Sequence, residues 1–358
     1  MDLDMEIPNE SAALELRAGE LVQVKTAEEI LVTLGEQGAL DKLPFMPEML
    51  QFCGKRFKVF KRAHKTCDTI NYTGARHMAD AVHLDGVRCD GNSHGGCQAG
   101  CLIFWKEAWL KRVSSNEMND GSTDPIPMVA NSDKQPSKRA LPICTEDSLL
   151  KATRVMGKAD EHDGQVYSCQ ATDLLVATNP LPWWDFRQYW EDVRSGNVKV
   201  WDVIEAFIFR VFSKILKLGA YRLQLYLYNR IQSFRGATPY PFKFGNQTKT
   251  PSSSLNLQSG ELVLVKSQDE ILETVNSRNR NRGLSFDPEM VSFCGKEFRV
   301  LRRVEQIIDE KTGKMIHINS DCVMLDGVTC PSRYSNHRLF CPRSSYHYWR
   351  EIWLKRPV

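Results

Sequence analysis

Residues 43–62, LPFMPEMLQFCGKRFKVFKR, return as residues 284–303, LSFDPEMVSFCGKEFRVLRR, and this repetition decides the architecture of the chain. Each residue of the second copy lies 241 positions after its counterpart. Both copies place a Pro-Glu-Met triplet before Phe-Cys-Gly-Lys, and an alternating apolar and basic run follows. Self-similarity in one register indicates a repeated structural unit.

The repetition extends well beyond this stretch. Gly19–Val22 returns as Gly260–Val263 with the same spacing. After Cys89 the second copy gains three residues, and Trp105–Arg112 then corresponds to Trp349–Arg356. We therefore predict an internal duplication that flanks a different middle segment. The two predicted units are residues 14–112 and 255–358.

Each unit has the pattern of short strands with one inserted helix. Leu21–Val24 and Phe57–Lys61 alternate apolar and polar residues, which predicts strands. Thr26 and Glu29 have the spacing of a capping box, so a short helix is expected to begin after Thr26. Further strands are expected at 82–87 and within 102–110. We expect a small, strongly bent barrel in each unit, and a chain that is mainly β with some α.

The order of these elements resembles SH3-like barrels, such as the C-terminal domain of the nitrile hydratase β subunit. There too a Gly-x-x-Val strand opens the domain, and a Gly-containing strand follows a Pro-rich stretch. The chain is also similar to an uncharacterised bacterial family that shares LPFMPEMLQFCGKRFKVFKRAHKTCDT and FWKEAWLKR, here residues 43–69 and 104–112. These resemblances imply a fold and carry no catalytic residue with them.

The segments between the units differ in composition. Residues 113–160 and 236–254 are rich in small polar residues and proline, which predicts flexible linkers. Residues 161–235 match neither copy, and we expect a helical, Trp-rich middle segment. Within it, residues 201–234 carry an apolar stripe at helical spacing, with Arg210, Lys214 and Lys217 on the other side. Packing on the protein's own barrels is the favoured hypothesis. Peripheral membrane contact through 201–234 is the alternative.

The charge of the chain is nearly balanced. Its 358 residues carry a formal net charge of +3, which does not indicate a nucleic-acid or membrane partner. Lys55, Lys58 and Lys61 form a basic strand, and basic barrels of this type can bind nucleic acid. A solvated strand face is the favoured interpretation. The first residues lack the apolar core of a signal peptide, and no charge-free stretch of about 20 residues occurs. We therefore expect a cytoplasmic protein.

Eleven cysteines are many for a reducing compartment, where clustered thiols more often bind metal than form disulfides. Three cysteines of the first unit lie in or beside a glycine-rich loop, and a fourth belongs to the repeated stretch. Four thiolates suit tetrahedral zinc. The predicted zinc ligands of the first unit are Cys53, Cys89, Cys97 and Cys101.

The second unit keeps all but one of these thiols, since Ser345 replaces Cys101. His347 or His337 would then supply the fourth ligand. Inert buried thiols are the main alternative, and a redox or nucleophilic cysteine is a third hypothesis. The predicted ligands here are Cys294, Cys330, Cys341 and His347. The cysteines interpreted as incidental are Cys67, Cys144, Cys169 and Cys322.

Two similar barrels present two similar surfaces, which suits bivalent capture of a protein partner. The sequence carries no catalytic motif that stands out. We therefore predict a non-enzymatic binding or assembly protein with Cys-rich, zinc-stabilised barrels. The first alternative is an enzyme or enzyme-maturation factor with a site between the barrels and the middle segment. The second is a basic nucleic-acid or membrane-surface binder, and the balanced charge argues against nucleic acid.

Overall fold

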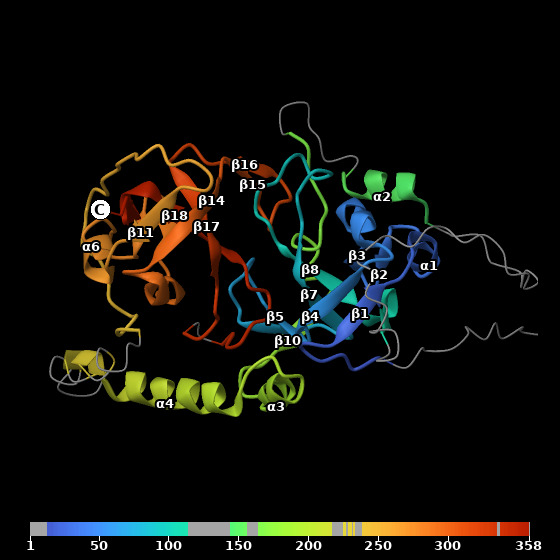
Figure 1. Ribbon diagram of the computed structural model, residues 1–358, viewed down its shortest axis with the longest axis horizontal. Helices are drawn as coiled ribbons and strands as arrows, with labels where there is room; N and C mark the ends of the chain where they lie inside the picture. Colours follow the sequence, from blue (N-terminus) through green and yellow to red (C-terminus); the bar gives the residue numbers. More distant parts are fainter. Residues whose placement is uncertain are drawn as a thin grey trace, which may run out of the picture.

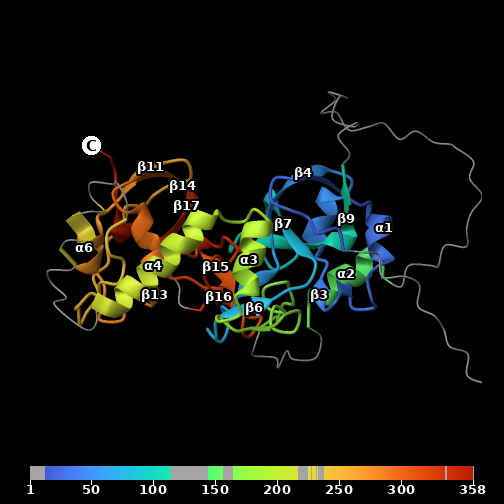
Figure 2. The same cartoon turned by 90° about the horizontal axis from the view of Figure 1, so that it is seen from below.

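The computed structural model describes residues 13–113, 144–155, 164–216, 238–334 and 337–357, with short pieces of 225–232. Two β-rich units lie side by side (Figure 1). Helices α3 (Arg187–Arg194) and α4 (Val200–Leu216) run along one side of them, α3 under the first unit and α4 under the second. Figure 2 looks onto this side of the molecule.

The first unit is built on a curled, five-stranded antiparallel sheet with the order β8–β7–β4–β1–β9. Its strands are β1 (Leu21–Val24), β4 (Arg56–Arg62), β7 (Ala81–Arg88), β8 (Leu102–Lys106) and β9 (Leu110–Arg112). The smaller elements are α1 (Ala27–Leu31), β2 (Ala39–Leu40), β3 (Leu43–Pro44), β5 (Lys65–Cys67), β6 (Ala75–His77) and the 3₁₀ helices Pro47–Phe52 and Glu107–Trp109.

The second unit has a sheet of the corresponding order, β18–β17–β14–β11–β19. Its strands are β11 (Leu262–Val265), β14 (Glu297–Arg303), β17 (Cys322–Thr329), β18 (Tyr346–Arg350) and β19 (Leu354–Lys355). The smaller elements are α6 (Gln268–Leu272), β12 (Arg280–Asn281), β13 (Leu284–Ser285), β15 (Gln306–Ile308), β16 (Met315–His317) and the 3₁₀ helices Pro288–Phe293 and Glu351–Trp353.

The two sheets agree in register as well as in order. Val59 pairs with Leu84 in the first sheet, and Val300 pairs with Leu325 in the second. The register shift that follows Val59 recurs after Val300, where a β-bulge bends the strand. The prediction that both units share one strand order is therefore met.

Local sequence explains the helix starts. The Thr26 side chain accepts a hydrogen bond from the Glu29 backbone N–H, and Glu29 bonds back to the Thr26 N–H. Ser267 and Glu270 form the same reciprocal pair at the start of α6. Both capping boxes satisfy amide groups that have no partner within the helix.

In each unit a buried carboxylate joins the first residues of the unit to its sheet. Glu107 is 2% exposed and accepts hydrogen bonds from the Leu16 backbone N–H and from Arg62. Its counterpart Glu351 is fully buried and is bonded to Leu257 and Arg303 in the same way. Buried charges of this kind are tolerated because each has a partner of opposite charge and several donors.

Tryptophan side chains fill the centre of each unit. Trp105 and Trp109 are fully buried in the first core and pack edge-on to Phe45. Trp349 and Trp353 are fully buried in the second core. These large rings supply much of the apolar area that a small sheet has to bury.

The segments predicted as linkers contain ordered, packed parts. Helix α2 (Glu146–Ala152) lies within 113–160, and its Leu149 is buried in the first core. The rest of that predicted linker beyond 113 and 144–155 lies outside the described residues. Residues 238–254 form no helix or strand, yet the Pro251 carbonyl accepts a hydrogen bond from Asn281, and Tyr240 is 3% exposed.

The middle segment also differs from the helical expectation. It contributes strand β10 (Asn179–Leu181), which pairs antiparallel with β6 and extends the first unit's smaller sheet to β10–β6–β5. One side of α4 packs on the second unit, where Ala206 and Phe207 meet Phe340 and Leu339. The favoured hypothesis of packing on the protein's own units therefore describes this side of the helix.

Candidate functional site

The two units meet through reciprocal contacts. Cys97 Sγ accepts a hydrogen bond from the Ile308 backbone N–H at 3.3 Å, and Cys341 Sγ accepts one from the Cys67 N–H at 3.1 Å. Cys341 is the repeat counterpart of Cys97, and Ile308 that of Cys67. The same contact is thus made once in each direction. Reciprocal contacts of this kind define an approximate two-fold axis between the units.

Residues on this axis touch their own counterparts. Thr69 hydrogen-bonds to Glu310, which lies 241 positions later. Arg343 is 3% exposed and donates to Thr69 Oγ1 at 2.7 Å and to Glu310 Oε1 at 2.5 Å. The buried guanidinium therefore has both a carboxylate and a hydroxyl acceptor, which offsets the cost of burying its charge.

A small apolar cavity of about 50 Å³ lies beside this interface. Four thiols line it, three from the first unit and one from the middle segment. These are Cys89, Cys97, Cys101 and Cys169. Burial raises the pKa of Cys101 to about 11 and that of Cys169 to about 12, so these thiols are protonated at neutral pH.

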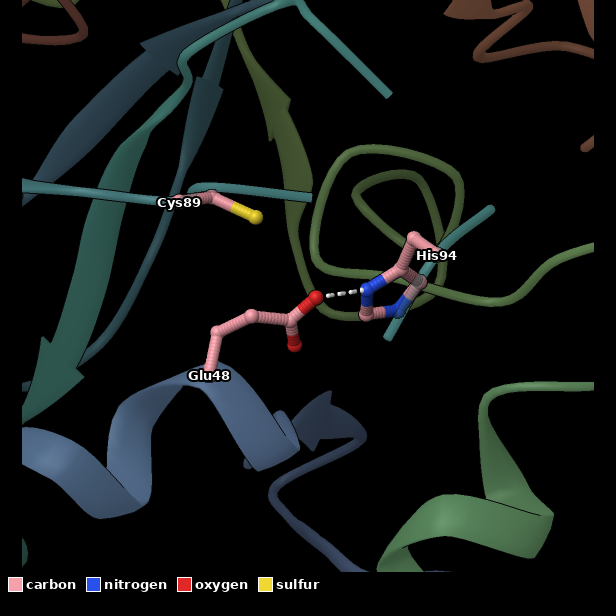
Figure 3. A group of neighbouring side chains, drawn as sticks. All are labelled: Glu48, Cys89 and His94. Atoms are coloured by element: carbon pink, nitrogen blue, oxygen red, sulfur yellow. Dashed lines mark hydrogen bonds and ion pairs between the residues drawn. The ribbon is translucent and has the colours of Figure 1, made fainter. Parts of the chain in front are cut away.

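Figure 3 shows a group of possible metal donors. Two of them, Cys89 and His94, also line the cavity. Glu48 comes from the 3₁₀ helix Pro47–Phe52, Cys89 follows β7, and His94 lies in the glycine-rich loop. One donor atom of each residue lies within 4.8 Å of the others. Across the part of the chain that the structure describes, no other three His, Cys, Asp or Glu side chains meet this criterion.

The hydrogen bonds of His94 restrict its protonation. Its Nε2 lies 2.9 Å from the Ser168 carbonyl oxygen, and a carbonyl only accepts, so Nε2 carries a proton. Its Nδ1 lies 2.6 Å from Glu48 Oε1. The neutral ring would place a nitrogen lone pair against a carboxylate oxygen, so at this distance a proton lies between the two atoms. A metal ion bound to both atoms would replace this proton and hold them farther apart, because zinc bonds to nitrogen and to oxygen are each about 2.0–2.2 Å long.

The surroundings of Glu48 and Cys89 also favour a bound cation. Glu48 Oε2 is buried and has no hydrogen-bond partner, although such atoms are normally satisfied. Burial, and then the nearby Glu48 carboxylate, raise the pKa of Cys89. A bound metal ion would reverse this effect, since a coordinated thiol loses its proton.

The second unit provides an internal comparison. Glu289, the counterpart of Glu48, accepts hydrogen bonds from the backbone N–H groups of Arg333 and Tyr334 at 2.9 and 2.7 Å. Glu48 likewise accepts from the Ser93 N–H at 3.0 Å. Anchoring the loop is therefore common to both carboxylates. The histidine is an addition of the first unit, because Ser335 occupies the corresponding position.

The structure brings together only part of the ligand set predicted for the first unit. Cys89, Cys97 and Cys101 share the cavity, whereas Cys53 packs against the first core, with Sγ 4.0 Å from the Met49 carbonyl oxygen. Cys169, interpreted as incidental, joins the cavity. Glu48 and His94 were not among the predicted ligands. Glu48 did leave a signal, because an acidic residue recurs inside an otherwise apolar motif.

The predicted ligands of the second unit are dispersed. Cys294 packs against the second core, and Cys330 Sγ lies 3.4 Å from Ser332 Oγ. His347 is buried beside Phe293, and burial lowers its pKa to about 4. The His337 ring lies beside Trp183 instead, with ring centroids 5.8 Å apart and a tilt of 52° between the planes. No three of these side chains form a close donor group within the described ranges.

Cys341 instead meets a thiol that the sequence did not connect with it. The side chains of Cys67 and Cys341 hydrogen-bond to each other. This bond, together with the Arg343 backbone N–H, lowers the pKa of Cys341 to about 7 although the residue is buried. Cys67 was interpreted as incidental because its counterpart is Ile308.

A larger cleft of about 1140 Å³ lies between the first unit and the middle segment. Charged side chains line it in pairs: Arg62 with Glu191 at 3.1 Å, and Arg194 with Glu15 at 2.8 Å. His64 lies at its wall, and burial lowers the His64 pKa to about 3. This neutral imidazole contacts Asp192, whose pKa burial raises to about 6.

The outer face of α4 is apolar and exposed. Trp201 is 76% exposed and Ile208 64% exposed, and Trp190 of α3 is 70% exposed. None of the helices in the described parts of the chain is long and apolar enough to cross a membrane.

Comparisons with family models, curated proteins and solved structures found no match to the chain. The resemblance to SH3-like barrels therefore stays a prediction.

Proposed function

We propose that this chain is a non-enzymatic binding protein made of two SH3-like barrels, and that its first unit holds a zinc ion at Glu48, Cys89 and His94. One observation carries the proposal. His94 Nδ1 lies 2.6 Å from a carboxylate oxygen of Glu48 while its Nε2 is committed to the Ser168 carbonyl. A proton lies between these two atoms, and a zinc ion would take its place, because the Cys89 thiol and a buried Glu48 oxygen without a hydrogen-bond partner lie beside them.

The donor types favour zinc. Imidazole nitrogen, thiolate sulfur and carboxylate oxygen are the three donors that zinc takes from proteins. Calcium and magnesium prefer oxygen donors alone. The hydrogen bond from His94 Nε2 to Ser168 resembles the outer contact that fixes the ring of a metal-binding histidine.

A bound ion would have a structural effect at the interface. It would link the 3₁₀ helix Pro47–Phe52 to the loop that carries Cys97, and Cys97 contacts Ile308 of the other unit. Holding this loop would hold the two units in their relative orientation. A fixed pair of similar surfaces suits bivalent capture of a protein partner, which supports the assembly role.

Metal content tests the proposal, and the repeat offers a matched control. Cys89→Ser removes a proposed ligand, whereas Cys330→Ser makes the same change at the counterpart position in the second unit. We expect the full chain to bind about one equivalent of zinc, and cobalt substitution to give a thiolate-to-metal charge-transfer band. Cys89→Ser should lose both signals, and Cys330→Ser should retain them. Equal metal content in all three proteins would contradict the site.

A second candidate function is contact with a lipid surface through α3 and α4. The exposed Trp190, Trp201 and Ile208 support it, since Trp favours the headgroup region of a bilayer. Ile208→Ser should weaken sedimentation with anionic vesicles. Val32→Ser, at a position 55% exposed in the first unit, is the control and should bind as the unaltered chain does. Phe207 is unsuitable for this test because it packs on Tyr189 with ring centroids 5.3 Å apart. Unchanged vesicle binding by Ile208→Ser, or none by the folded chain, would reject this function.

A further inference from the structure

Two thiols from different units meet at the interface. Cys67 ends β5 in the first unit, and Cys341 lies 274 residues later, in the loop before β18. The Cys67 backbone N–H donates to Cys341 Sγ at 3.1 Å, and the two side chains are hydrogen-bonded. Two thiols within hydrogen-bond reach of each other need little movement to form a disulfide.

The surroundings stabilise a thiolate at Cys341. Its sulfur accepts hydrogen bonds from two backbone N–H groups, those of Cys67 and Arg343, and from the Cys67 thiol. The Arg343 guanidinium is close enough to act on both cysteines, and Lys65 acts on Cys341. Donors and cations around one sulfur are the surroundings in which a cysteine reacts with oxidants.

We propose that Cys67 and Cys341 are a peroxide-responsive dithiol that closes to a disulfide and links the two units covalently. The Cys341 thiolate attacks one oxygen of a hydroperoxide, the O–O bond breaks, and hydroxide or alkoxide leaves. This step gives a sulfenic acid on Cys341. The Cys67 sulfur then attacks Cys341 Sγ, its proton joins the departing hydroxyl as water, and the S–S bond forms. The two thiols lose two electrons in total, and the peroxide gains them.

A peroxide suits the burial of the site. Cys341 is 3% exposed, and Cys67 is only partly exposed, so a small oxidant has better access than a bulky disulfide. A thiol reductant would reopen the bond by thiol–disulfide exchange.

The repeat supplies a natural control. Cys97 occupies the position in the first unit that Cys341 occupies in the second, and it also accepts a backbone hydrogen bond, from Ile308 at 3.3 Å. The residue that faces it from the other unit is isoleucine, so no thiol of the second unit is available there to link the units. Of the two symmetry-related contacts, only the one between Cys67 and Cys341 is therefore a dithiol.

Mass spectrometry of the full chain tests the proposal. The chain is treated with hydrogen peroxide, free thiols are alkylated, and the digest is searched for linked peptides. We expect the 67–341 linkage to exceed any other cysteine pair by about tenfold, and dithiothreitol to reverse it. Cys97→Ser should form it to the same extent. Cys89→Ser, which removes a proposed zinc ligand, should form it too, so this test is separate from that of the metal site.

Cys67→Ser gives the second measurement. Without its partner thiol, oxidised Cys341 should persist as a sulfenic acid and react with dimedone. Because serine keeps the backbone N–H and nearly the same size, the fold should be retained, as circular dichroism would show. Two results overturn the proposal: loss of thiols with no 67–341 linkage in the unaltered chain, or no dimedone adduct at Cys341 in folded Cys67→Ser.

Discussion

Lowering the pH from 7 to 4 should destabilise this protein strongly, because it buries neutral histidines. Burial lowers the pKa of His64 and of His83 to about 3, and that of His347 to about 4. In the unfolded chain each histidine takes up a proton near pH 6.5. Between pH 6.5 and these lower values the unfolded state binds more protons, so the free energy of unfolding falls as the pH falls.

The size of the effect follows from the pKa differences. One pKa unit corresponds to about 1.4 kcal/mol, so each of the three histidines should remove about 3 kcal/mol at pH 4. Asp192 acts in the opposite direction, because its pKa is raised to about 6 in the folded state. Its protonation should therefore add about 2 kcal/mol to the free energy of unfolding over the same pH range. The net loss of roughly 7 kcal/mol is comparable to the whole stability of a typical domain.

Urea unfolding followed by tryptophan fluorescence at several pH values between 7 and 4.5 would measure this dependence. His83→Met is a suitable variant, because Met324 occupies the corresponding buried position in the second unit. It should lower the slope of unfolding free energy against pH by about one proton, or about 1.4 kcal/mol per pH unit, near pH 5. A stability that is constant from pH 7 to 5, or an unchanged slope in folded His83→Met, would refute the reasoning.

Two further substitutions test the architecture. Glu351→Gln removes the charge of a fully buried carboxylate that binds Arg303, and urea unfolding should show a loss of about 3–5 kcal/mol; a loss below 1 kcal/mol would argue against a tightly paired site. Gly91→Ala would place a Cβ 2.0 Å from the Cys97 carbonyl oxygen, at a φ of +75°. It should open the glycine-rich loop and raise the alkylation rate of Cys97, whereas Gly19→Ala, whose Cβ has no atom within 4 Å, should leave that rate unchanged.

The candidate site shows how far sequence patterns reach. Cys89, Cys97 and Cys101 were predicted to gather, and they line one cavity. Cys53 was grouped with them because it recurs in the repeat, but recurrence marks any position that the fold needs. A thiol packed in a core recurs for the same reason as a ligand does.

In the middle of the chain, the sequence patterns predicted less order than the structure shows. Residues 113–160 were predicted as linker from their composition, yet α2 forms within them and buries Leu149. Composition measures average polarity, whereas a seven-residue helix needs only one or two apolar side chains to dock on a neighbouring core. The outer apolar face of α4 was visible in the sequence. Which side of the helix is exposed depends on Phe340 and Leu339 of the second unit, far along the chain.

The sequence by itself determined the two related units, their capping boxes and their alternating strands. These features are local or repeat at a fixed spacing, so they can be detected along the chain without its fold. Only the tertiary structure decided which cysteines meet. Cys67 and Cys341 are 274 residues apart in different units, and their contact depends on how the units dock about their two-fold axis. Glu48 and His94 meet within the first unit, because the loop after β7 folds back onto the 3₁₀ helix Pro47–Phe52. A one-dimensional pattern carries no information on either arrangement.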